Sequence, residues 1–135
     1  MSQVIGDGVI HASIYNEDAS LTWHFDGVID GSERNAPVSV KAGVNKTVEV
    51  APADAELVGR LFKAEDRTVE GIKVCSVFHH GVWTFPYDEL AAPAVGDSVV
   101  GAGAGKVKKA GAGAGKNTLV SSVDTTAKTC DVIFR

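Results

Sequence analysis

The amino-acid sequence predicts an all-β protein, and three features of the 135-residue chain indicate this class. The chain is rich in valine, whose branched side chain suits the pleated surface of a sheet. Apolar and polar residues alternate in several short runs, whereas no long segment keeps a helical period. The 15 glycines, several of them in Asp-Gly pairs, separate these runs as tight turns do. Because strands with one apolar face suit antiparallel pairing, we expect a mainly antiparallel sheet.

The alternation is clearest in a run near the N-terminus and in the last run of the chain. Between Ser20 and Val28, the side chains of Leu21, Trp23 and Phe25 fall on one face of the expected strand. At the C-terminus the apolar face carries Cys130, Val132 and Phe134. Two shorter runs alternate in the same way, with valines on the apolar face, at 38–40 and 44–50.

A β-hairpin is expected in the middle of the chain. Residues 68–78 and 81–87 both have strand composition, and His79 and His80 lie between them at the expected turn. Proline cannot donate a backbone hydrogen bond, so Pro86 predicts an edge or an end of the second strand.

Residues 54–64 are the one candidate for a helix. Asp54 could cap it, and Leu57, Leu61 and Phe62 could share an apolar stripe. Gly59 weakens a helix, and the same residues also have the composition of a strand that contains a glycine. We favour a brief turn that enters a strand.

Size and charge narrow the classes of function. A chain of 14.0 kDa can bury about two-thirds of its surface, which is enough for one core but not for two. Its net charge of −4 and pI near 5.5 disfavour a nucleic acid as partner. The mean hydropathy of +0.07, without an apolar run near 18 residues, disfavours a membrane span. The N-terminus has no basic region ahead of an apolar stretch, so we expect no secretory signal.

The motif GAGAGK occurs twice, at 101–106 and 111–116. A phosphate-binding loop would need an earlier glycine and a Ser or Thr after the lysine, and neither copy has them. Dinucleotide binding fails as well, because Lys106 and Lys116 stand where the third glycine would be. We expect flexible loops that flank a short strand at 106–110.

The residues that most often carry chemistry form no recognisable site. Cys75 and Cys130 match no metal or redox spacing, so we expect small buried hydrophobic side chains. His79 and His80 are adjacent and would point to opposite faces of a strand, which disfavours a shared metal ion. We therefore predict no catalytic residue, no metal and no cofactor, and we expect a protein that is not an enzyme.

Two aromatic rows could serve either a core or a binding surface. Trp83, Phe85 and Tyr87 alternate on one face and are expected in the core or at a subunit contact. A sugar-binding platform is the alternative, because exposed aromatic rings stack on sugars. Residues 1–36 form either an extended N-terminal arm or the first hairpin of the barrel. The candidate contacts with a partner or a neighbouring subunit in this region are Val4, Ile5, Val9, Ile10, Leu21, Trp23 and Phe25.

From about Ala55 to Arg135 several features follow one another in a recognisable order. They are a glycine-containing strand at 58–61, a strand at 69–74, the Gly-Val-aromatic strand at 81–85, a turn at 95–99, a basic strand at 106–110 and a closing strand at 129–134. This succession resembles the small head decoration, or cement, proteins of tailed bacteriophages.

The resemblance implies a small antiparallel β-barrel or β-tulip-like domain that the terminal strand closes. We expect this domain to span residues 37–135, after the N-terminal arm or first hairpin of residues 1–36, which does not follow the shorter members of the family. It also implies a virion protein on the outer capsid surface, made in the host bacterial cytoplasm, whose partner is the major capsid protein. Members form homotrimers or sometimes dimers and have no catalytic residues. The alternatives are another virion structural subunit, such as a tail or head-completion protein, and a soluble β-sandwich module that binds carbohydrate or another ligand.

Overall fold

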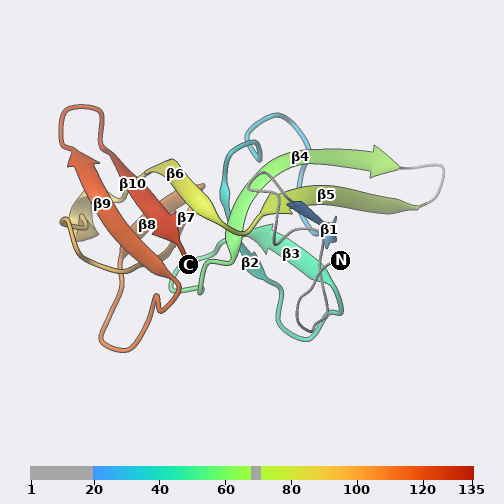
Figure 1. Ribbon diagram of the computed structural model, residues 1–135. Helices are drawn as coiled ribbons and strands as arrows, with labels where there is room; N and C mark the ends of the chain where they lie inside the picture. The colour runs from blue at the N-terminus through green and yellow to red at the C-terminus, as the bar shows by residue number, and fades with distance from the viewer. Residues whose placement is uncertain (1–19, 68–70) are drawn as a thin grey trace, which may run out of the picture.

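The computed structural model describes residues 20–67 and 71–135, which form ten β-strands and one short 3₁₀ turn without any α-helix (Figure 1). The prediction of an all-β protein is confirmed. Within this part of the chain no helix could cross a membrane. In chain order the elements are β1 (Ser20–Phe25), β2 (Pro37–Val40), β3 (Thr47–Val50), β4 (Gly59–Arg67), β5 (Ile72–Phe78), β6 (Gly81–Pro86), η3 (Glu89–Ala91), β7 (Val99–Gly103), β8 (Lys106–Lys109), β9 (Thr118–Asp124) and β10 (Thr129–Phe134).

The first five strands form a closed barrel in the order β1-β3-β2-β4-β5, and β5 returns to β1. All pairs are antiparallel except β1 with β3, which run parallel. The expected antiparallel barrel therefore contains one parallel pair. The barrel encloses a core of apolar side chains, namely Phe25, Val38, Val48, Leu61, Ala64, Cys75 and Val77.

The remaining strands form a second lobe beside the barrel (Figure 1). Its sheet has the order β6-β10-β9, and β7 pairs with β8 in a hairpin. Sparse backbone contacts join the two sheets: Tyr87 bridges to Val107, and Val120 N–H donates to the carbonyl of Asp97 at 2.8 Å. The core of this lobe consists of Ala51, Leu57, Phe85, Tyr87, Val99, Val107, Val120, Cys130, Val132 and Phe134.

The expectation of a single core is wrong, because apolar side chains gather in two clusters. Five short strands close on themselves and leave no inner face for the strands that follow, so these build a core of their own. Ala51 and Leu57, from the segment that joins β3 to β4, pack into the second core and tie the lobes together. β1 is a barrel strand, so residues 1–36 supply a strand to the same barrel as β2 to β5.

The predicted hairpin around His79 and His80 is wrong. β5 pairs with β4 and β1, whereas β6 pairs with β10 in the other lobe. A strand has two edges, and both edges of β5 are taken inside the barrel. The two histidines therefore lie on the crossing from one lobe to the other. Pro86 ends the edge strand β6, as predicted.

The turn-and-strand interpretation of residues 54–64 is confirmed, since β4 begins at Gly59. The burial pattern of the last strand is confirmed as well: Cys130, Val132 and Phe134 are buried and their neighbours are not. The implied barrel closure by this strand is wrong. β10 lies at the centre of the three-stranded sheet, and the closed barrel consists of β1 to β5.

Candidate binding surface

The predicted contact residues of β1 differ in their access to a partner. Leu21 is 53% exposed at the start of the strand, Trp23 is partly buried, and Phe25 is 5% exposed inside the barrel. Their shared face points into the barrel, because Leu21 pairs with the buried Val77. Leu21 and Trp23 therefore keep exposed area near one end of the barrel. The remaining candidates lie outside the described residues, namely Val4, Ile5, Val9 and Ile10.

Trp23 is fixed by His79, which lies on the crossing between the lobes. The indole Nε1–H donates to His79 Nε2 at 3.0 Å, and His79 Nδ1 lies 2.8 Å from the carbonyl oxygen of Val58. This geometry requires a neutral imidazole with its proton on Nδ1, because Nε2 must accept. Burial lowers the pKa of His79, and the neighbouring His80 lowers it further. His79 thus links β1, the approach to β4 and the start of the second lobe.

An arginine stacked on aromatic rings lies on the barrel's outer face at the junction of the two lobes. We call Arg60, Phe62, Phe78 and Trp83 the arginine–aromatic cluster. The Cζ atom of Arg60 lies 4.2 Å from the ring centroid of Trp83 and 5.7 Å from that of Phe78. Phe78 contacts Trp83 at 5.4 Å and Phe62 edge-on at 5.2 Å between centroids. The strands β4, β5 and β6 each supply part of it.

Sequence reasoning missed Arg60, Phe62 and Phe78. A signal was present, because Arg60 and Phe62 flank Leu61 in a strand and so point to the opposite face from that core residue. An outward phenylalanine beside an outward arginine is typical of a contact surface. Phe62 is 50% exposed, which agrees with this position.

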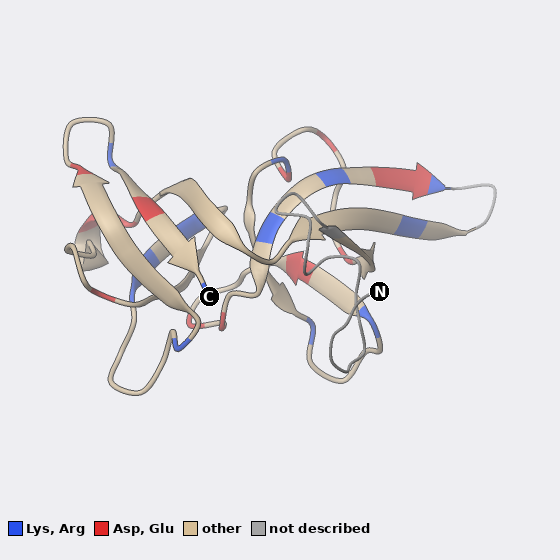
Figure 2. Ribbon diagram, viewed as in Figure 1, with Lys and Arg blue, Asp and Glu red and all other residues tan. Residues whose placement is uncertain are grey.

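The charged residues do not define a second candidate binding surface beside the arginine–aromatic cluster. Acidic and basic residues are both found on each lobe (Figure 2). Apolar side chains protrude singly elsewhere, and the most exposed is Leu90 at 96%, on the 3₁₀ turn η3. Asp88 caps that turn by accepting from the backbone N–H of Leu90 at 3.0 Å. Leu90 is therefore held outward by a defined turn.

An open groove of about 600 Å³ lies between the barrel and the β7–β8 turn. Three carboxylates line it, from Asp26, Glu33 and Glu49. Asp26 is paired with Lys41, and Glu33 accepts the backbone N–H groups of Asp30 and Gly31 at 2.9 and 2.7 Å. The acidic side chains therefore serve mainly to hold the loop after β1.

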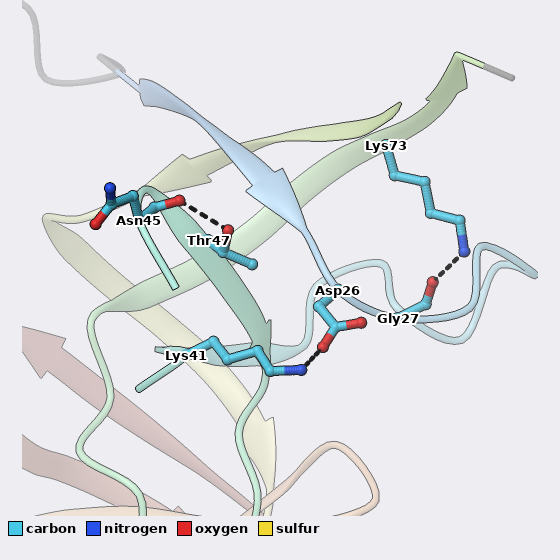
Figure 3. A network of polar contacts seen from close by, with 6 residues as sticks. All are labelled: Asp26, Gly27, Lys41, Asn45, Thr47 and Lys73. Atoms are coloured by element: carbon cyan, nitrogen blue, oxygen red, sulfur yellow. Dashed lines mark hydrogen bonds and ion pairs between the residues drawn. The ribbon is translucent and has the colours of Figure 1, made fainter. Parts of the chain in front are cut away.

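Further polar contacts hold the loop after β1 and the turn before β3 in place (Figure 3). Lys73 reaches from β5 to the carbonyl oxygen of Gly27 at 2.7 Å. Thr47 Oγ1 donates to the carbonyl oxygen of Asn45 at 2.9 Å, at the start of β3. A side chain of β5 thus ties the loop after β1 to the barrel, and a side chain of β3 fixes the turn before that strand. Among residues 20–67 and 71–135, no group of three or more His, Cys, Asp or Glu side chains could hold a metal ion.

The two cysteines behave as predicted. Cys75 lies in the barrel core and Cys130 in the second core, and both are free and buried. Burial raises the pKa of each thiol to about 11, so neither is a thiolate near neutral pH.

The GAGAGK segments are more ordered than the flexible loops that the sequence predicts. Gly101 lies in β7, and the first segment turns directly into β8. In the second segment the backbone N–H of Gly115 donates to both carboxylate oxygens of Glu56, at 3.1 and 2.9 Å. Gly115 has φ +70°, which favours glycine at this position. The predicted short strand between the segments is confirmed as β8.

The aromatic row of β6 belongs to the core, as predicted. Phe85 and Tyr87 are buried in the second core, and Trp83 packs partly against it. No protein-family model matches the chain, and a search of curated proteins finds no match.

Proposed function

We propose that this chain is a non-enzymatic capsid decoration, or cement, protein. It binds the outer surface of an assembled phage head through the major capsid protein and stabilises that head. The proposal is supported by the order of sequence features between Ala55 and Arg135. It is also supported by the arginine–aromatic cluster, because arginine and tryptophan are the residue types that dominate binding energy at protein interfaces.

The mechanism follows from mass action. A protein that binds only the assembled shell stabilises that state by RT ln(1 + [L]/Kd). Many copies on one shell, each in contact with several subunits, add avidity, so modest single contacts suffice. Strands that are already folded around a core lose little conformational entropy on binding, which keeps the cost of association low.

A homo-oligomer, with a trimer favoured over a dimer, is part of this proposal. Large apolar side chains with considerable exposure, such as Leu21, Phe62, Val82 and Leu90, supply area that contacts between copies or with the shell would cover. Burial of such area contributes about 25 cal/mol per Å².

The alternative of a sugar-binding module requires an exposed row of aromatic rings that contains Trp83. Phe85 and Tyr87 of that row are buried, and the guanidinium of Arg60 covers Trp83. The geometry therefore favours protein adhesion over stacking on a sugar.

Co-sedimentation with assembled shells tests the proposal. The purified chain should sediment with shells up to a fixed number of copies per shell and should not bind unassembled capsid subunits. A variant that lacks residues 1–18 tests the predicted arm, and undiminished binding would exclude the arm as a contact. Absence of saturable binding by the full-length chain would refute the proposed function.

A further inference from the structure

Arg60 differs from an ordinary surface arginine in its surroundings. Its Nε atom is buried and has no hydrogen-bond partner, and the same holds for Nε1 of the neighbouring Trp83. Within the described part of the chain the guanidinium forms no ion pair. A partly desolvated charge without a counter-ion costs free energy, so this arrangement is unfavourable for the free protein.

The cluster holds the guanidinium in one orientation. Cation–π contacts with Trp83 and Phe78 hold it at the junction of the lobes. Attraction to the ring faces offsets part of the desolvation cost, but within the described residues the buried Nε–H still lacks an acceptor. Phe62 stands beside this group with half of its surface exposed. A fixed guanidinium next to an exposed ring offers one charged contact and one apolar contact to the same partner.

We infer that Arg60 receives a carboxylate side chain from the outer surface of a capsid subunit, with Phe62 covered by apolar atoms beside that carboxylate. This inference rests on the proposed function and specifies the chemistry of its partner. A carboxylate fits because its two oxygens match the planar fork of arginine, whereas an ammonium or a neutral amide does not. The charge of Arg60, which has no counter-ion among the residues that the structure describes, gives the complementarity.

The test combines a variant of this chain with a chemical change in the partner. Arg60→Met removes the charge but keeps an unbranched apolar stem that can pack on Trp83. Arg34→Ala is the matched control, because Arg34 is an exposed arginine on the loop between β1 and β2. Shells are used intact or after carbodiimide coupling to glycinamide, which converts their surface carboxylates to neutral amides. Thermal melting confirms that both variants are folded.

The inference predicts that Arg60→Met binds intact shells about thirtyfold more weakly or worse, because truncation of one member of a buried charge pair leaves the other charge buried without a partner. Arg34→Ala should change the affinity by no more than about twofold, as expected for a rim charge. Blocked shells should bind wild-type chain as weakly as intact shells bind Arg60→Met, with no further loss when both changes are combined.

The outcomes separate the inference from the proposed function. If wild-type chain binds intact shells and Arg60→Met binds equally well, the inference is overturned and the function stands. The same holds if carboxylate blocking leaves wild-type binding unchanged, a result that does not depend on the folding of any variant. If wild-type chain does not bind intact shells, both are overturned.

Discussion

Substitution of Gly101 by alanine should destabilise the seam between the two lobes. Gly101 lies in β7, where that strand approaches Ala51 and Pro52 in the segment that joins β3 to β4. A Cβ atom at this position would lie 2.4 Å from the carbonyl oxygen of Pro52 and 2.7 Å from Cβ of Ala51. Both distances are far below van der Waals contact, so one backbone segment must move.

The cost follows from two effects. Overpacking in a closed site costs about 1–3 kcal/mol. Movement also strains two hydrogen bonds of 2.9 Å, from Asp54 N–H to the Gly101 carbonyl and from Gly101 N–H to the Ala55 carbonyl, each with a net value of about 1 kcal/mol. We therefore expect a loss of about 3 kcal/mol in the free energy of unfolding, or about 10 °C in Tm for a chain of this size.

Thermal and urea unfolding, followed by far-ultraviolet circular dichroism, measure this loss. Gly111→Ala is the matched control, because Gly111 also belongs to a GAGAGK segment but has open space around its Cα and an ordinary φ. That variant should be neutral or more stable by about 0.4–1 kcal/mol, since alanine restricts the unfolded chain. Equal stability of the two variants would refute the close approach of β7 to the segment that joins β3 to β4.

Two further predictions concern titratable groups. The pKa of His79 in the folded chain lies below its ordinary value of about 6.5. As the pH falls, the unfolded chain therefore binds a proton at His79 before the folded chain does. The free energy of unfolding should be fully present above pH 6.5 and should decrease as the pH drops below that value. Urea unfolding at pH 7.5 and 5.5 measures this fall. His79→Gln should reduce it more than His80→Gln does, because burial lowers the pKa of His79 more than the charge of His80 does. An unchanged fall in His79→Gln would exclude His79 as its source. Cys75 and Cys130 should react with a thiol reagent at pH 8 only after denaturation, because both thiols are buried and protonated; rapid reaction in native buffer would contradict their burial.

Period-two alternation predicted the strands that bury one face against a core. β10 shows this best, because six residues alternate without interruption and the buried set Cys130, Val132 and Phe134 is apolar throughout. Shorter runs were less informative. Val40 and Val44 were expected on the buried face, but β2 ends at Val40 and Val44 lies in the following turn, so both are exposed.

Strand partners were harder to predict than the strands themselves. Adjacent strands most often pair as hairpins, which favoured β5 with β6, but the sequence contains no signal that β1 occupies the free edge of β5. The parallel pair of β1 with β3 likewise brings together segments with no local turn between them. Closure of the barrel by β1 separated the chain into two cores.

The arginine–aromatic cluster depends on the same long-range pairing. Alternation around Leu61 places Arg60 and Phe62 on the outer face of β4, so their direction was predictable. The rings that orient Arg60 come from Phe78 and Trp83, on two other strands. Only the crossing from β5 into the second lobe brings Trp83 to the barrel, and the sequence indicated a hairpin there instead.

Thermal disruption of assembled phage shells, measured at increasing concentrations of this chain, tests the proposed decoration function most directly. If the chain binds the assembled shell but not the separate capsid subunits, the disruption temperature should rise with the logarithm of the chain's concentration above Kd. A disruption temperature that stays constant while the chain is present in large excess would contradict a stabilising role on the capsid.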